Sequence, residues 1–176
     1  MPDVPPQPPE QVIGRTRRST THVARLAVLR HAYAGKKVSD PAQDFERGLD
    51  AKGAAIAARL PGTVTRHLRP RVILASPFLR CVQTVWPLAT TLALSVREDE
   101  RLAPHRSAEE LRQALLEAPP DTVICTHGEV IEQLFDGAVT CAKGAFWIVE
   151  RHADGRLVPT EYVEAPHLVR ATGSIV

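Results

Sequence analysis

Two histidines and two arginines follow three separate apolar segments of this chain. Arg30 and His31 come directly after the first segment, Arg80 lies a short turn after the second, and His127 comes directly after the third. A neutral histidine can attack phosphorus as a nucleophile, and an arginine pairs in a two-pronged way with phosphate oxygens while staying charged at physiological pH. These residue types favour phosphoryl-transfer chemistry that needs no metal ion.

The three apolar segments predict buried strands at 23–30, 71–75 and 121–126. Helical patterns lie between them, which indicates a mostly parallel sheet. The carboxyl ends of parallel strands meet at one edge of a sheet, in the crevice where open α/β sheets bind ligands. We therefore expect the histidines and arginines to converge there, although they are far apart in the sequence.

The remaining pattern predicts an α/β fold, a three-layer sandwich with a mostly parallel sheet between helices and an antiparallel C-terminal hairpin. An aspartate cap and a capping box mark the starts of two of the helices. The turn Asp154-Gly155 separates the two hairpin strands. The expected elements are helices at 50–60, 78–92, after Ser107 and at 129–135, and strands at 94–96, 144–150 and 156–163.

Composition limits the functional classes. The chain has 176 residues, a net charge of +2 and 5% aromatic residues, which argues against nucleic-acid binding. No apolar stretch approaches the roughly 20 residues that span a membrane, and three widely spaced cysteines suit a reducing cytoplasm. We expect a cytoplasmic protein with a disordered, proline-rich tail at 1–21 and one domain at 22–176.

Each candidate also has a simpler interpretation. His31 and Arg30 could merely end a strand, Arg80 could be an exposed helix residue, and His127 could be a buried structural histidine. A second Arg-His pair, Arg151-His152, precedes the hairpin turn without partner motifs, so it is expected at the surface. The other histidines lack ligand spacing, and we predict no metal site and no cofactor.

Three segments carry a family resemblance: LRHAYAG at 29–35, LASPFLRCVQT at 74–84 and CTHGEVI at 125–131. In this order they resemble the three signature blocks of the histidine phosphatase superfamily, with its phosphoglycerate mutase-like fold. The Arg-His-Ala form and the segment DFERGLDAKG at 44–53 resemble its compact SixA-like branch. The segment KGAFWIV at 143–149 is similar to the phosphatase domain of mycobacterial MutT-type Nudix hydrolases.

The resemblance implies roles for the four residues. His31 would be the phosphorylated nucleophile, Arg30 and Arg80 would grip the phosphate, and His127 would donate a further hydrogen bond to the phosphoryl oxygens. For substrate binding we expect four additional residues. They are Lys36 in the loop after the first strand, Ser76 (alternatively a helix cap), Gly128 and Glu129.

The proton donor to the leaving group is not identified. In the family a carboxylate often follows the fourth strand, but the matching stretch here, 101–104, has none. Glu129 could supply the acid or simply favour a helix start. Glu100, Glu109 and Asp44 are weaker candidates that we expect at the surface. A phosphohistidine or a nucleotide phosphate would need less protonation to leave.

The sequence therefore predicts a metal-independent phosphatase that works through a phosphohistidine on His31. Its substrate would be a phosphohistidine protein, or a nucleotide or other small phosphorylated metabolite, selected by the loops 33–47 and 101–108. A non-catalytic phosphate-binding module is the alternative. A phosphoglycerate-type mutase is a weaker one, because it needs an acid and base that work in both directions. Neither a nucleic acid nor a membrane is expected as a partner.

Overall fold

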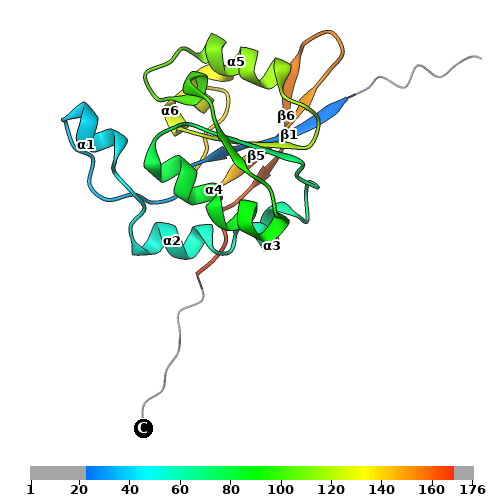
Figure 1. Ribbon diagram of the computed structural model, residues 1–176. Helices are drawn as coiled ribbons and strands as arrows, with labels where there is room; N and C mark the ends of the chain where they lie inside the picture. Colours follow the sequence, from blue (N-terminus) through cyan, green and yellow to red (C-terminus); the bar gives the residue numbers. More distant parts are fainter. Residues whose placement is uncertain (1–22, 169–176) are drawn as a thin grey trace, which may run out of the picture.

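A computed structural model describes residues 23–168 of the chain (Figure 1). The tail predicted at 1–21 lies outside these residues. Six strands form one sheet in the order β3-β2-β4-β1-β5-β6. The strands are β1 Ala24–Arg30, β2 Val72–Ala75, β3 Val96–Glu98, β4 Thr122–Thr126, β5 Phe146–Arg151 and β6 Leu157–Val163. The helices are α1 Pro41–Phe45, α2 Ala51–Ala57, α3 Leu60–Val64, α4 Leu79–Leu92, the 3-10 turn η1 Glu100–Leu102, α5 Ala108–Glu117 and α6 Gly128–Leu134.

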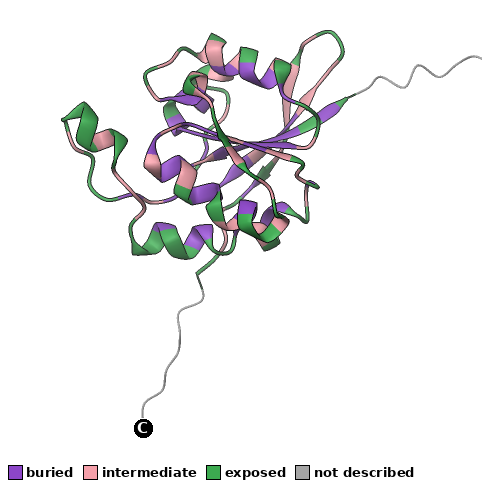
Figure 2. Cartoon of the chain, in the orientation of Figure 1, coloured by how far each residue is buried: buried purple, intermediate pink, exposed green. Residues whose placement is uncertain are grey.

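Helices cover both faces of the sheet (Figure 1). Alternate residues of β1 point to opposite faces, so Ala27 and Leu29 pack under α3 and α4, while Leu26 and Val28 pack under α5 and α6. The central strands β1 and β4 are accordingly among the most deeply buried elements, whereas α1 has no buried residue (Figure 2). The predicted three-layer sandwich is confirmed.

Strand pairing brings the predicted site residues to one edge. Strands β1 to β4 run parallel to one another, with β4 between β1 and β2. β5 runs antiparallel to β1, and β6 runs antiparallel to β5. Arg30 pairs with Thr126, and Ala75 pairs with Cys125. The residues that follow these three strands therefore lie beside one another, as the sequence predicted.

Several element boundaries differ from the prediction. The single helix expected at 50–60 is two helices, because Pro61, which has no backbone N–H, occupies the first turn of α3. The strand expected at 94–96 begins at Val96. Ala93 ends α4 in a left-handed conformation (φ 53°), and the Leu94 N–H donates to the Ala89 carbonyl, so these residues belong to the helix cap.

The caps predicted at Asp50 and Ser107 are confirmed. The Asp50 carboxylate accepts from the Gly53 N–H at 2.8 Å, and Ser107 and Glu110 form a complete capping box. All three cysteines are buried and free, and Cys81 and Cys125 belong to the core as expected. Between residues 23 and 168, no helix combines the length and the apolar character needed to cross a membrane.

Candidate active site

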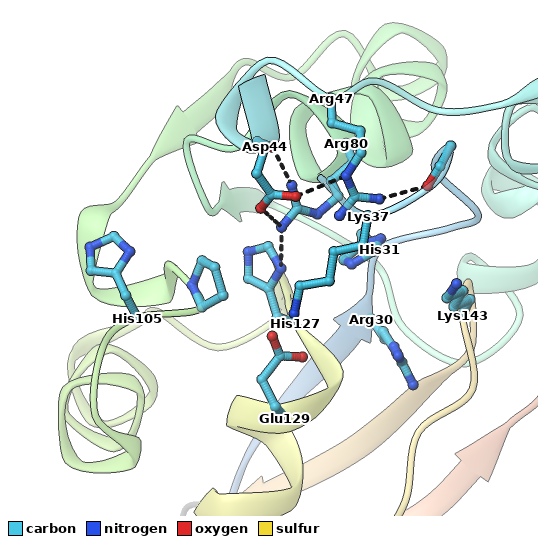
Figure 3. Close-up of a pocket in the computed structure, with 12 residues that line it drawn as sticks. Arg30, His31, Lys37, Asp44, Arg47, Arg80, His105, His127, Glu129 and Lys143 are labelled. Carbon is cyan, nitrogen blue, oxygen red and sulfur yellow. Dashed lines mark hydrogen bonds and ion pairs between the residues drawn. The ribbon is translucent and has the colours of Figure 1, made fainter. Parts of the chain in front are cut away.

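A cavity of about 410 Å³ opens at the carboxyl edge of the sheet (Figure 3). The strand ends contribute its floor, and the loops 33–47 and 101–108, which we expected to select the substrate, contribute its walls. Its lining residues are Arg30, His31, Gly35, Lys37, Asp44, Arg47, Arg80, Pro104, His105, His127, Glu129 and Lys143. The structure thus brings together the two histidines and two arginines that the sequence singled out.

His31 is held with one ring nitrogen free. Its backbone N–H donates to the Thr126 carbonyl at 3.0 Å, and its Nδ1 lies 2.8 Å from the Ala32 carbonyl oxygen. A carbonyl can only accept, so the ring proton is on Nδ1 and the lone pair of Nε2 is available. Burial, helped by the charges of Arg80 and Arg30, lowers the pKa of His31 to about 4. The imidazole is therefore neutral near pH 7, as a nucleophile must be.

Helix α4 fixes the chain on either side of the cavity. The Thr84 hydroxyl accepts from the Ala32 N–H at 3.0 Å and donates to the Arg80 carbonyl at 2.6 Å. The Gln83 side chain accepts from the Leu49 N–H at 2.8 Å. Thr84 and Gln83 thus tie the loop after β1, and hence His31, to the helix that carries Arg80.

The two arginines keep free donors in the cavity wall. Arg30 donates through Nη1 to the Cys141 carbonyl at 2.8 Å, and Arg80 donates through Nη1 to the Asp44 carbonyl at 2.7 Å. The Nε of each guanidinium is buried and has no hydrogen-bond acceptor among the described residues. Arg80 is only 3% exposed, so the interpretation of an exposed helix residue is wrong. Guanidinium groups that line a cavity and are only partly satisfied by the protein are suited to an incoming oxyanion.

His127 lies against His31, with 5.2 Å between the ring centroids. Its Nδ1 is 3.5 Å from Nη2 of Arg80, and its Nε2 is 3.0 Å from the Ser76 hydroxyl. Burial, reinforced by His31 and Arg80, lowers its pKa to about 2, so this ring is also neutral. Ser76 can donate to Nε2 as well as accept from it, which would allow a proton on the Nδ1 that faces Arg80.

Ser76 is not the cap of α4. That helix begins after Phe78, has no side-chain cap bond, and leaves the Ser76 oxygen 3.5 Å from the Phe78 N–H. Ser76 is fully buried and does not line the cavity. Its hydroxyl contacts His127, so its effect on a bound substrate would pass through that ring.

Lys37, and not Lys36, lines the cavity. Adjacent side chains on an extended loop point to opposite sides, and this pair follows the bend at Gly35. Figure 3 shows the Lys37 side chain reaching into the space near His127. The prediction was therefore one residue out of position.

Asp44 also lies in the cavity and not at the surface. Its carboxylate accepts from Nε of Arg47 at 2.9 Å and from Nη2 of Arg80 at 3.2 Å. Burial alone would raise its pKa, but the contacts with Arg47 and Arg80 outweigh burial and hold the pKa of Asp44 below its usual range. Glu129 is exposed at the rim, with its carboxyl group facing the cavity (Figure 3). Glu100 and Glu109 do not line the cavity.

Gly128 makes room for Arg30. It does not line the cavity, but a Cβ at this position would lie 2.5 Å from the Arg30 guanidinium carbon. We expect Gly128→Ala to displace that guanidinium and to lower kcat roughly 10- to 100-fold, because small misplacements of binding groups are costly. Steady-state kinetics measures the loss.

Gly62→Ala is the matched control for Gly128→Ala. Gly62 also lies in a helix, and a Cβ there would meet no atom within 4 Å. This variant should keep full activity and gain about 0.5–1 kcal/mol of unfolding free energy. Equal activity of the two alanine variants would show that Arg30 does not depend on the space at Gly128.

The second Arg-His pair has a structural role at the far end of β5. Arg151 donates to the carbonyls of Leu115, Leu116 and Ala118 at 2.6–2.8 Å, which satisfies the end of α5. His152 follows the strand at the hairpin turn, as predicted. Among the described residues, no group of three or more histidine, cysteine or carboxylate side chains could hold a metal ion.

Comparisons with known proteins agree with this geometry. The family model of the histidine phosphatase superfamily (branch 1) matches residues 26–105. An 8-oxo-(d)GTP phosphatase of Mycolicibacterium smegmatis is 27% identical over 172 residues, covering 89% of this chain and 53% of that protein. The chain thus spans about half the length of this curated relative.

Solved structures with the same fold include two phosphatases. The protein histidine phosphatase SixA complexed with tungstate aligns with a TM-score of 0.67 and 18% identity, over 79% of this chain and 96% of SixA. A phosphoserine phosphatase from Entamoeba histolytica, complexed with 3-phosphoglyceric acid, aligns with a TM-score of 0.63 and 16% identity, over 82% and 99%. At these identities the likeness establishes the fold.

Proposed function

We propose that this chain, whose residues 26–105 match the family model of the histidine phosphatase superfamily, is a metal-independent phosphatase that forms a phosphohistidine at His31. The observation that carries the proposal is the arrangement of the His31 ring. Its Nδ1 proton is committed to the Ala32 carbonyl at 2.8 Å, its pKa is about 4, and its Nε2 lone pair is free in a cavity that Arg30 and the buried Arg80 also line. A neutral, oriented nucleophile next to preorganised positive charge is suited to phosphoryl transfer.

The reaction proceeds in two displacements. In the first, Nε2 of His31 forms a bond to phosphorus while the bond from phosphorus to the leaving oxygen breaks. Arg30 and Arg80 donate to the phosphoryl oxygens, and the Nδ1–H of His31 stays on the Ala32 carbonyl. In the second, water attacks the phosphorus, the N–P electron pair returns to Nε2, and the protons of the water leave on the released phosphate. Placing positive groups around the transferring phosphoryl is the main source of such catalysis.

Within the site, His127 and Ser76 complete the set of groups around the position of the phosphoryl group. Nη2 of Arg80 can only donate, so Nδ1 of His127 accepts it at 3.5 Å and the ring proton is on Nε2, toward Ser76. When a phosphoryl oxygen takes over the Arg80 donor, Ser76 can donate to Nε2 and the His127 proton can lie on Nδ1. In this tautomer His127 offers a third donor to the phosphoryl group. Its pKa of about 2 keeps it from adding a net charge beside His31.

Trapping the covalent intermediate tests the proposal. We expect a rapid alkaline quench during turnover of p-nitrophenyl phosphate to give a phosphoryl group on the peptide that contains His31, stable to base and lost in acid. Mass mapping of the quenched protein measures it, and a pre-steady-state burst of p-nitrophenol gives its stoichiometry.

Two outcomes would contradict the phosphohistidine. One is a phosphoryl group on another residue, and the other is turnover without burst or covalent adduct. A chain that binds vanadate but turns over no phosphoester or phosphoramidate would instead be the phosphate-binding module considered above.

A further inference from the structure

We infer that the catalytic cavity continues into a second anion subsite formed by Tyr33, Lys52 and Lys143, and that the substrate is a phosphoanhydride. This inference rests on the proposed function and names its substrate class. The group transferred to His31 would be a terminal phosphoryl group, and the next phosphate of the substrate would lie in the second subsite.

Lys143 connects the two spaces. It lines the catalytic cavity and also an adjoining cavity of about 330 Å³, whose other walls include Tyr33, Lys52 and Tyr162. The Nζ of Lys52 lies 3.8 Å from the centre of the Tyr33 ring, and the Nζ of Lys143 lies 5.1 Å from it. Tyr33 is two residues from His31, so both ammonium groups are held beside the nucleophile's own loop.

The position of Tyr33 is fixed by helix α2. Its carbonyl accepts from the Asp50 N–H at 3.1 Å, and a Cβ at Gly53 would overlap this same carbonyl oxygen. The glycine therefore permits the helix to approach Tyr33 closely. This close contact places Lys52, the neighbour of Gly53, over the tyrosine ring.

The two cavities together carry more positive charge than the binding of one phosphate monoester requires. The catalytic cavity has five cationic side chains and two carboxylates, of which Asp44 is already held by Arg47 and Arg80. The chain has only four lysines, and three of them, Lys37, Lys52 and Lys143, line one or the other cavity.

These lysines are not neutralised by the protein. Within residues 23–168, none of the ion pairs includes a lysine. The acidic residue of the adjoining cavity, Glu164, lies 3.9 Å from His167. Uncompensated ammonium groups close to a phosphate site favour a ligand with additional negative charge.

A phosphoanhydride also fits the carboxylates of the site. When Nε2 of His31 attacks the terminal phosphorus, the bond to the bridging oxygen breaks, and that oxygen keeps the electron pair as part of a phosphate. This leaving group is stable as an anion, so no acid has to protonate it. Asp44, held ionised by its two arginines, cannot supply such a proton. Lys143 and Lys52 would instead stabilise the charge that develops on the departing phosphate.

Comparing substrates in lysine variants tests the inference. We would measure kcat/KM for p-nitrophenyl phosphate, inorganic pyrophosphate, tripolyphosphate, ADP and a phosphohistidine peptide. For Lys143→Ala and Lys52→Ala we expect the loss with the phosphoanhydrides to exceed the loss with p-nitrophenyl phosphate by about 10-fold, the size of one charge-assisted contact. Lys36→Ala, which changes a lysine outside both cavities, should alter neither value.

Comparing the substrates with one another shows which kind of phosphoanhydride the site binds. A higher kcat/KM for ADP than for pyrophosphate and tripolyphosphate would identify a nucleotide as the substrate. The reverse order would identify an inorganic polyphosphate. Equal losses for all substrates in both lysine variants, or a higher kcat/KM for the phosphohistidine peptide than for every phosphoanhydride, would overturn the second subsite. The phosphohistidine at His31 would still stand in either case, because it is tested by trapping.

Discussion

The His31→Asn variant is expected to lose turnover by a factor on the order of 10⁴ to 10⁶, comparable to removal of a catalytic nucleophile in other enzymes. An asparagine side chain places its amide nitrogen near the position of Nδ1. It can therefore keep the hydrogen bond to the Ala32 carbonyl, which the imidazole makes at 2.8 Å. The substitution removes Nε2 but not the local anchor, so the loss would measure the nucleophile itself.

A matched variant at the second Arg-His pair controls for this change. His152 lies at the hairpin turn outside the catalytic cavity, and His152→Asn should keep full activity. Both variants are measured by initial rates with p-nitrophenyl phosphate, and thermal unfolding checks that His31→Asn is folded. Activity of folded His31→Asn within tenfold of the parent would rule out His31 as the nucleophile.

The sequence predicted the strand ends of the site better than its loops. Arg30 ends β1, His31 and His127 directly follow β1 and β4, and the pairing of such parallel strands brings their ends together. The continuous apolar run at 23–29 also predicted a strand buried on both faces. These features depend on local patterns and on a general rule of sheet topology, so the sequence alone was sufficient to predict them.

The loop contributions could not be derived in the same way. Asp44 was expected at the surface, yet its carboxylate turns inward from the short, exposed helix α1 to Arg80 and Arg47. Lys37 and Lys36 are identical in type, and only the course of the loop decides which one faces the cavity. Lys143 is distant in sequence and reaches the site through the turn before β5.

One feature of the sequence points to the proposed second subsite. Glycine at 53 and lysine at 52 and 143 are ordinary in isolation, but lysine is rare in this chain compared with arginine. The segments 44–53 and 143–149, which supported the family resemblance, contain two of these lysines. Their relation to Tyr33 depends on the packing of α2, which no local pattern specifies.

Replacement of Arg80 is expected to have the second largest effect. Arg80→Ala should lower kcat about 10²- to 10³-fold, the usual loss for one donor to a developing oxyanion. Arg80→Lys should recover only part of this activity. The guanidinium contacts Asp44 through two nitrogens, at 2.7 Å and 3.2 Å, and also lies 3.5 Å from Nδ1 of His127. A single ammonium cannot keep these contacts and grip a phosphoryl group as well.

The kinetic pattern distinguishes catalysis from simple binding or instability in the Arg80 variants. If Arg80 stabilises the transition state, kcat and kcat/KM fall together, and inhibition by vanadate weakens in parallel. Arg71→Ala is the control, because that side chain is 80% exposed and far from the cavity lining. A higher KM at unchanged kcat would instead assign Arg80 to ground-state binding alone. A loss that follows unfolding temperature would mean that the Arg80–Asp44 pair mainly holds α1 in place.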